Sequence, residues 1–161
     1  MNLLASAPVW LIWFLIILLI VAAAEDAVRL KISNVLCLGV LAAAVVAMAL
    51  AGLETSLWQN ALVFAVLLAA GTLLFGLGKV GGGDVKLLAA VGLWCDLGAA
   101  LTMVPSVLIS GGVLALLILA VRTFAPAAAS ARIVVLKPGG GIPYGVAIAA
   151  GALLTLAIYH F

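Results

Sequence analysis

Two aspartates, Asp26 and Asp84, are the residues of this sequence whose type and setting could carry chemistry. Asp26 follows the end of one apolar run, and Asp84 stands at the start of another. Two carboxyl groups that lie close together cannot both ionise without a large penalty, so they share one proton. The ionised group can take a proton from water while the other donates its proton to a carbonyl oxygen. Such a pair could hydrolyse a peptide bond.

The elements that must position these aspartates are membrane helices. Of the 161 residues, 69% are apolar and 7% are charged, which is too little charge to cover a soluble domain. A helix needs about 20 apolar residues to cross a bilayer core, and such runs fill most of the chain. We therefore predict an all-α membrane protein with six transmembrane helices, forming a single transmembrane domain over residues 1–161. The segments are Pro8–Ala24, Ile32–Leu53, Leu57–Gly76, Asp84–Trp94, Gly98–Val121 and Pro143–Tyr159.

The fourth segment is too short to cross a bilayer core at about 1.5 Å per residue. Either it begins inside a cavity, or it continues through Cys95 and Asp96.

The basic residues indicate how the segments are oriented. Every Lys and Arg lies in or beside the connections that follow the first, third and fifth segments. The charged residues of the other two connections are the acidic Glu54 and Asp96. The positive-inside rule places Lys- and Arg-bearing loops in the cytoplasm. Both termini are then expected on the outer side, and Asp26 and Asp84 at the cytoplasmic edge. The basic loops are better explained as topology determinants than as a binding patch, so we expect no nucleic-acid partner.

Other catalytic arrangements lack the residues they need. His160 is expected on the opposite face, where it cannot form a Ser/His or Cys/His pair with a residue near the aspartates. Cys37, Cys95 and one histidine cannot supply the four ligands of a typical zinc site, and the two cysteines are expected too far apart for a disulfide. The Gly-rich stretch 81–83 is not followed by the Gly-Lys-Ser/Thr of a phosphate loop. We expect neither a metal nor another cofactor.

Position alone leaves a purely structural interpretation of the aspartates open. An aspartate at a helix end is often an interfacial charge or a cap, and Asp84 would make a good N-cap. Asp26 has Glu25 and Arg29 beside it, as an ordinary juxtamembrane stretch might. The first segment could also be a signal peptide cleaved near Ala22–Ala24, although no basic residue precedes its long apolar run.

Three motifs distinguish between these interpretations. The stretch Asp26–Asn34, DAVRLKISN, resembles the first signature of the type IV prepilin peptidases, which has Asp, then Arg or Lys, then Ile-Pro-Asn. Ser33 stands where that family usually has Pro. The stretch Gly81–Leu87, GGGDVKL, resembles the second signature, Gly-x-Gly-Asp followed by Val-Lys-Leu. Pro143–Gly145, PYG, is similar to the motif near the family's final helix.

The resemblance covers nearly the whole chain and implies an aspartic endopeptidase whose catalytic pair is Asp26 and Asp84. It implies a prepilin or pseudopilin substrate, with a short basic leader before an apolar helix, cleaved at the cytoplasmic edge of the bacterial inner membrane. Long members add a domain with two CxxC pairs that methylates the new N-terminus. This sequence is similar to the short CpaA/TadV-like members of tight-adherence pilus systems, so cleavage without N-methylation is expected.

Other residues of these motifs are expected to bind or position the substrate. They are Gly81, Gly82, Gly83, Arg29, Asn34, Lys86, Pro143, Tyr144 and Gly145. The glycines at 81–83 can take positive φ and let the backbone approach a substrate closely, whereas Arg29 and Lys86 can equally be topology determinants. Helix dipoles predict that Asp84, at a helix N-terminus, is ionised, and that Asp26, at a helix C-terminus, donates the proton.

Two other functions are open to a membrane protein with these aspartates. A small proton-coupled transporter relays protons through acidic groups, but those groups are expected at mid-membrane and not at one edge. A non-catalytic pilus or secretion assembly subunit would tolerate substitution of both aspartates. Small residues such as Gly39 and Gly151 permit close helix contacts, within one subunit or between subunits of an oligomer, so the oligomeric state is left open.

Overall fold

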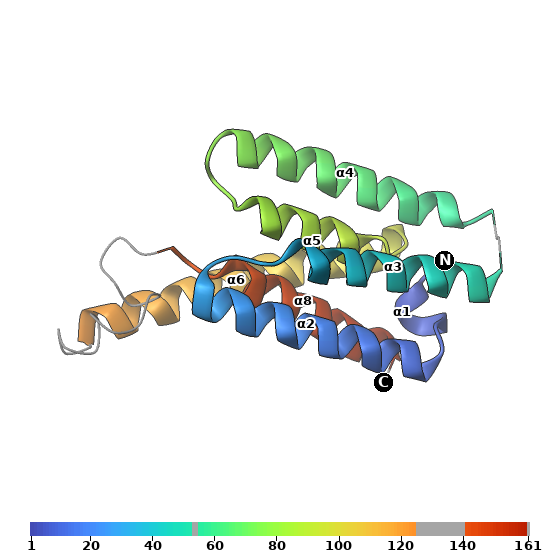
Figure 1. The fold of residues 1–161 in the computed structure, drawn as a ribbon, viewed down its shortest axis with the longest axis horizontal. Coiled ribbons are helices and arrows are strands. Elements are labelled where there is room, and N and C mark those ends of the chain that lie inside the picture. Colours follow the sequence, from blue (N-terminus) through green and yellow to red (C-terminus); the bar gives the residue numbers. More distant parts are fainter. Residues whose placement is uncertain (53–54, 125–140, 161) are drawn as a thin grey trace.

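The computed structural model describes residues 1–52, 55–124 and 141–160, and these residues form helices joined by short connections (Figure 1). In chain order the helices are α1 (Leu3–Ser6), α2 (Val9–Arg29), α3 (Asn34–Ala51), α4 (Leu57–Gly76), α5 (Gly82–Gly92), α6 (Leu97–Phe124) and α8 (Tyr144–His160). Each predicted apolar segment is helical, with its ends shifted by a few residues, while the short helix α1 was not predicted. Glu54, Arg132 and Lys137, which contributed to the predicted orientation, lie outside the described residues.

Four of these helices, α2, α3, α4 and α6, are long and apolar enough to cross a membrane. Helix α8 is apolar but shorter, and α5 is shorter still. The chain is therefore a multi-pass membrane protein, and the expected all-helical fold is confirmed. The exact number of six crossings stays a prediction.

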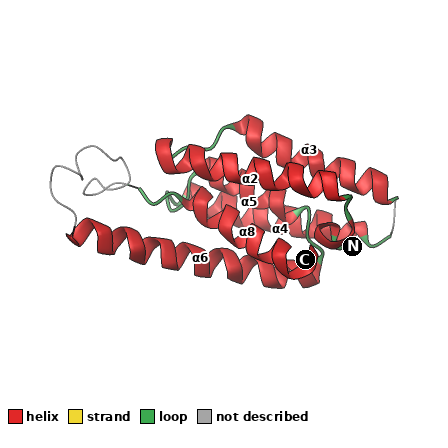
Figure 2. Cartoon of the chain, turned by 90° about the horizontal axis from the view of Figure 1, so that it is seen from below, coloured by secondary structure: helices red, strands yellow, loops and turns green. Residues whose placement is uncertain are grey.

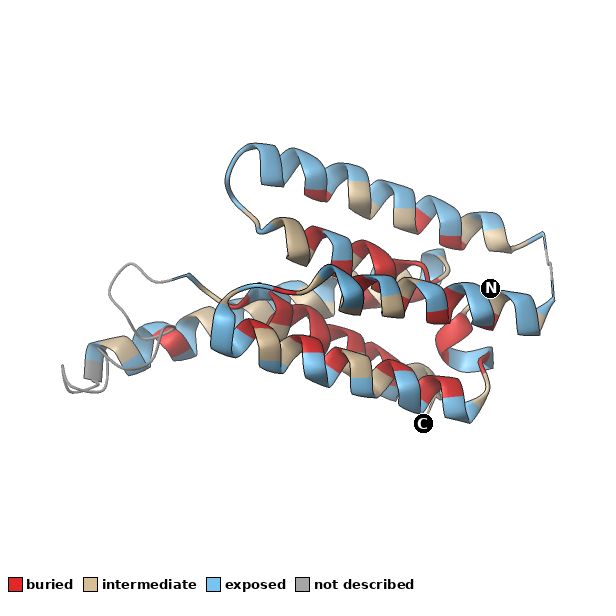
Figure 3. Ribbon diagram, in the orientation of Figure 1, coloured by how far each residue is buried: buried red, intermediate tan, exposed pale blue. Residues whose placement is uncertain are grey.

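Helix α2 shows why one aspartate faces the protein interior. Apart from the adjacent pair at its start, its buried residues recur every three or four positions, so they form one stripe along the helix: Leu11, Ile12, Leu15, Leu19, Ala22 and Asp26. The opposite face exposes large apolar side chains such as Trp13 and Ile17, as expected for a surface in contact with lipid. Figure 3 shows exposed and buried positions alternating along α2. Asp26 thus continues the buried stripe, where the other positions carry apolar side chains.

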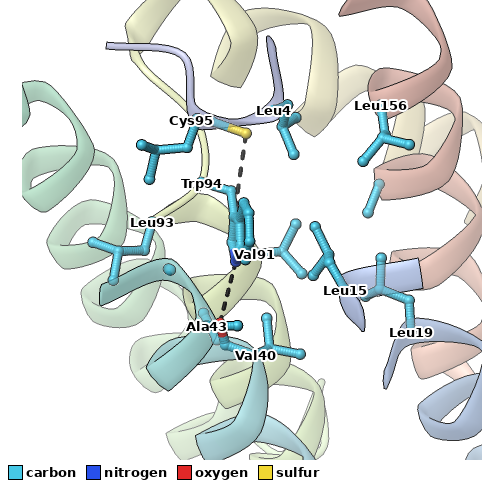
Figure 4. Packing of buried hydrophobic residues seen from close by; sticks show 14 of the residues in the cluster. Leu4, Leu15, Leu19, Val40, Ala43, Val91, Leu93, Trp94, Cys95 and Leu156 are labelled. Atoms are coloured by element: carbon cyan, nitrogen blue, oxygen red, sulfur yellow. Dashed lines mark hydrogen bonds between the residues drawn. The ribbon is translucent and has the colours of Figure 1, made fainter. Parts of the chain in front are cut away.

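The far end of short helix α5 is closed by a buried turn. The helix ends at Gly92, so it does not extend through Cys95 and Asp96. The fully buried Trp94 donates its indole N–H to the carbonyl oxygen of Val40 at 3.2 Å (Figure 4). The carbonyl oxygen of Trp94 accepts the N–H of Leu3, in α1, at 3.0 Å. Non-helical backbone is tolerated at membrane depth where the protein itself satisfies its polar groups, so α1 and α3 explain how an 11-residue helix fits here.

Close packing among α2, α6 and α8 sets the position of the site. A Cβ atom at Gly151 in α8 would lie 2.5 Å from the Cα of Val107 in α6, so only glycine allows this approach. Helix α8 also packs along α2, and Figure 2 shows α8 lying beside α6 over much of its length. As a result, the C-terminal end of α2 and the N-terminal ends of α5 and α8 meet at one end of the bundle (Figure 1).

Candidate active site

Asp26 is held between two helices. It lies in the last turn of α2, which continues to Arg29, and not beyond the end of the helix as the sequence analysis expected. Its side chain is 3% exposed. The Oδ2 atom accepts the backbone N–H of Gly145 at 2.6 Å. This donor belongs to the first turn of α8, where backbone N–H groups lack an acceptor one turn earlier in the helix.

Gly145 makes this contact possible because it has no side chain. A Cβ atom there would lie 2.6 Å from Ile32 Cδ1 and 2.9 Å from Asp26 Oδ2. The buried Pro143 precedes α8, and its carbonyl oxygen accepts the N–H of Val146. The PYG motif therefore begins α8 directly against Asp26, a contact between residues 119 positions apart.

Asp84 lies in the first turn of α5. Its carboxyl group accepts the backbone N–H of Gly81, the residue that caps this helix. This is one half of a capping box, in which the side chain at the third helical position bonds back to the N-cap. The other oxygen, Oδ1, is buried without a hydrogen-bond partner among the described residues. A buried polar atom of this kind is costly unless it has a function or binds a ligand.

The two aspartates line the same cavity, of about 180 Å³. Its walls come from the end of α2 and the start of α5: Asp26, Leu30, Lys31, Ile32, Gly81, Gly82, Gly83 and Asp84. The structure thus brings together the two carboxyl groups and the Gly-rich stretch that the sequence analysis singled out. A water molecule and a peptide carbonyl group in this space would therefore share a cavity with both aspartates.

Three lining residues, Leu30, Lys31 and Ile32, were not predicted as part of the site. Leu30 has φ 52° and ends α2 in the left-handed conformation, with its N–H bonded to the Asp26 carbonyl oxygen at 2.8 Å. Such a cap is usually glycine, because a side chain disfavours this region. Nothing in the sequence marks Leu30 for this role. Ile32, in contrast, belongs to the first signature, so its place there was a usable signal.

The predicted role of positive φ at the Gly-rich stretch is wrong, because Gly81 has φ −72° and the described glycines with positive φ are Gly52 and Gly78. What the stretch provides is space. A Cβ atom at Gly81 would lie 2.6 Å from Asp84 Oδ2, and one at Gly83 would lie 3.1 Å from the Ile32 carbonyl oxygen. Small residues here let α5 begin against both Asp84 and the loop after α2.

The remaining predicted residues lie around this cavity but do not line it. Lys86 donates to Asn34 Oδ1 at 2.8 Å, which ties α5 to α3 and joins the two signatures. Arg29 is 71% exposed and pairs with Glu25 at 3.5 Å. Tyr144 lines a second, largely apolar cavity that also contains Asp84. The structure thus assigns Asn34 and Lys86 a helix-joining contact, and places Arg29 on the surface.

Ser33, the departure from the usual proline, has its own local contacts. Its backbone N–H donates to Glu25 Oε2 at 2.9 Å, and its Oγ accepts the N–H of Leu36 at 3.4 Å at the start of α3. Proline has no N–H, so the first contact requires a residue other than proline. The turn between α2 and α3 is therefore held by a side-chain cap and a charged acceptor.

These features define a helical, multi-pass membrane protein with two carboxyl groups in one small cavity at the end of its bundle. The type IV leader peptidase family matches residues 13–121, so the chain belongs to this family, and the predicted family membership is confirmed. Membership implies a peptidase, of the aspartic type in this family, acting on a prepilin-type substrate in a membrane. No curated protein and no solved structure matches the chain.

Proposed function

We propose that this protein is a prepilin leader peptidase in which Asp26 and Asp84 form the catalytic pair. One observation carries this proposal. The two aspartates come from helices far apart in the sequence and line one cavity, and Asp84 Oδ1 is buried there without a hydrogen-bond partner among the described residues. An aspartate that only capped α5 would not need a second carboxyl group beside it.

The hydrolysis uses the two carboxyl groups as base and acid. The ionised group takes a proton from water as the water oxygen attacks the scissile carbonyl carbon. The protonated group donates to the carbonyl oxygen, so the tetrahedral intermediate carries no net charge at that oxygen. The carbon–nitrogen bond then breaks as the leaving amine takes up the proton that the first aspartate received. One hydroxyl group of the intermediate returns a proton to the second aspartate as the carbonyl group re-forms, so both aspartates regain their starting protonation states.

The hydrogen bonds favour Asp26 as the base and Asp84 as the proton donor. The backbone N–H of Gly145, at the N-terminus of α8, donates to Asp26, and such a donor stabilises a carboxylate. The unpartnered Oδ1 of Asp84 can carry the shared proton toward a substrate carbonyl. This assignment reverses the one expected from the sequence, which considered only the helix that carries each aspartate and not the start of α8.

The remaining features of the proposal follow the family resemblance and the charge pattern. The substrate carries a short basic leader before an apolar helix, and the chain cleaves it without N-methylation. The cavity lies at the cytoplasmic face of the inner membrane, and both chain termini lie on the periplasmic side. In support of this orientation, Lys31 lines the cavity and Lys79 lies in the connection before α5, at the same end of the bundle.

The proposal is tested by co-expressing this protein with a pilin-like precursor and measuring the precursor's intact mass in isolated membranes. We expect the precursor to lose the mass of its leader only when the protein is present, and the new N-terminus to carry no methyl group. Unprocessed precursor in membranes that contain the folded protein would contradict the peptidase assignment. A product heavier by one methyl group would contradict cleavage without methylation.

A further inference from the structure

A second cavity shares Asp84 with the first cavity, but Asp26 is not among the residues that line it. It has a volume of about 360 Å³ and lies among α4, α5, α6 and α8. Its walls are almost entirely apolar or small, and include Gly71, Leu74, Leu108, Gly112, Ala115 and Tyr144. Asp84 is the charged residue in this lining, so the two cavities meet at the same side chain.

The second cavity lies along an open seam of the bundle. Helix α4 packs closely on α5 but touches α6 only sparsely, and Figure 1 shows α4 at the edge of the bundle. Leu108, on the α6 side of the seam, is 69% exposed, and Leu74, on the α4 side, is 45% exposed. The cavity is therefore accessible from the surrounding apolar phase as well as from Asp84.

We infer that this cavity seats the apolar helical segment of the substrate, with the scissile bond next to Asp84. The inference rests on the proposed function and adds the substrate's path to it. A polypeptide cleaved at Asp84 must continue away from the catalytic cavity on the side that follows the leader. An apolar helix buries its side chains there and leaves its backbone hydrogen bonds intact within the membrane. Small residues in the wall let that helix approach closely.

A third cavity, also largely apolar, is not connected to the aspartates in this way. It lies among α3, α4 and α5 and includes Cys37, Phe64 and Lys86, but neither aspartate lines it. A substrate helix seated there would have its scissile bond away from the carboxyl groups. The cavity that contains Asp84 is therefore the one that joins helix binding to cleavage.

Gly112 provides the sharpest test, because a Cβ atom there would meet no other atom within 4 Å. In Gly112→Phe the ring occupies the proposed path without clashing at its Cβ. The test substrate is a precursor with an apolar helix of about 20 residues, the length needed to span a bilayer. We expect its cleavage rate to fall at least tenfold. Ala120→Phe is the matched control, since Ala120 is an exposed α6 residue outside the cavity. We expect its cleavage rate to stay within twofold of wild type. Equal rates in the two variants would overturn the inference.

Photo-crosslinking gives a readout that does not depend on catalysis. In the Asp84→Asn protein, a photoreactive residue at Leu108 should crosslink to the precursor helix, whereas one at the exposed Ile17 of α2 should not. Crosslinks from Leu108 only to lipid, or to a second copy of the protein, would overturn the inference. If wild-type protein fails to cleave while the Leu108 crosslink forms, the proposed catalysis fails and the docking path stands.

Discussion

Replacing either aspartate of the pair with asparagine should abolish precursor cleavage while the protein stays folded. We expect Asp26→Asn and Asp84→Asn each to lower the cleavage rate by at least roughly 10³-fold, because each removes one of the two groups that must exchange a proton with water or substrate. The rate of leader removal in membranes, followed by mass spectrometry, measures the effect. Retention of more than a tenth of the wild-type rate by either variant would remove that aspartate from the catalytic pair.

The amide variants should fold because an amide oxygen can replace the accepting carboxylate oxygen. In Asp26→Asn the side chain can still accept the N–H of Gly145, and in Asp84→Asn it can still accept the N–H of Gly81. Asp96→Asn is the matched control. Asp96 Oδ1 accepts the N–H of Ala99 at 2.9 Å at the start of α6, at the other end of the bundle. Its substitution should leave the cleavage rate unchanged, and a large loss there would indicate a general effect of such changes.

The second large effect is expected from a single methyl group. In Gly145→Ala the new Cβ would lie 2.9 Å from Asp26 Oδ2 and 2.6 Å from Ile32 Cδ1, so Asp26 must move or α8 must shift. Misplacing a catalytic group by about 1 Å can reduce the rate by 10²-fold. We therefore expect a loss of roughly that size in the cleavage rate, with little change in the amount of protein in the membrane.

Gly76→Ala is the control for this change, because a Cβ atom at Gly76 has no neighbour within 4 Å. Alanine also favours a helix more than glycine does, so Gly76→Ala should cleave at the wild-type rate. The prediction for Gly145 fails if Gly145→Ala cleaves the precursor at the same rate as Gly76→Ala. A mere folding defect would instead appear as reduced protein in the membrane for Gly145→Ala.

The helices could be predicted from the sequence because apolar length is a strong signal in a membrane protein. Segment ends were less certain, because polar residues such as Asp26 and Arg29 can belong to a helix that leaves the apolar core. Hydropathy also gave no indication of α1, which covers the turn at Trp94 and donates a hydrogen bond to it. The shortness of α5 was visible in the sequence, but the protein segments that cover its end were not.

The proposed catalytic residues could be identified by motif, but their environment could not. The two signatures singled out Asp26 and Asp84, and the PYG motif was expected to position the site. No local pattern indicates that the N–H of Gly145 bonds to Asp26 across 119 positions, because helix packing alone produces that contact. The proposed protonation states differ from those expected from the sequence for the same reason, since the dipole of α8 acts on Asp26 across a tertiary contact. The left-handed Leu30 cap also depends on the turn that packing imposes.

The most direct measurement is whether positions 26 and 84 can be bridged in the native membrane. Asp26→Cys and Asp84→Cys are combined in a protein whose Cys37 and Cys95 are replaced by alanine, and the membranes are treated with a short bifunctional thiol reagent. A shared cavity predicts one intramolecular bridge per protein, seen as the mass of one tether with no free thiol. The pair Asp26→Cys and Asp96→Cys, at opposite ends of the bundle, should give no bridge. Two separate adducts at positions 26 and 84, with no bridge, would contradict the shared cavity on which the account depends.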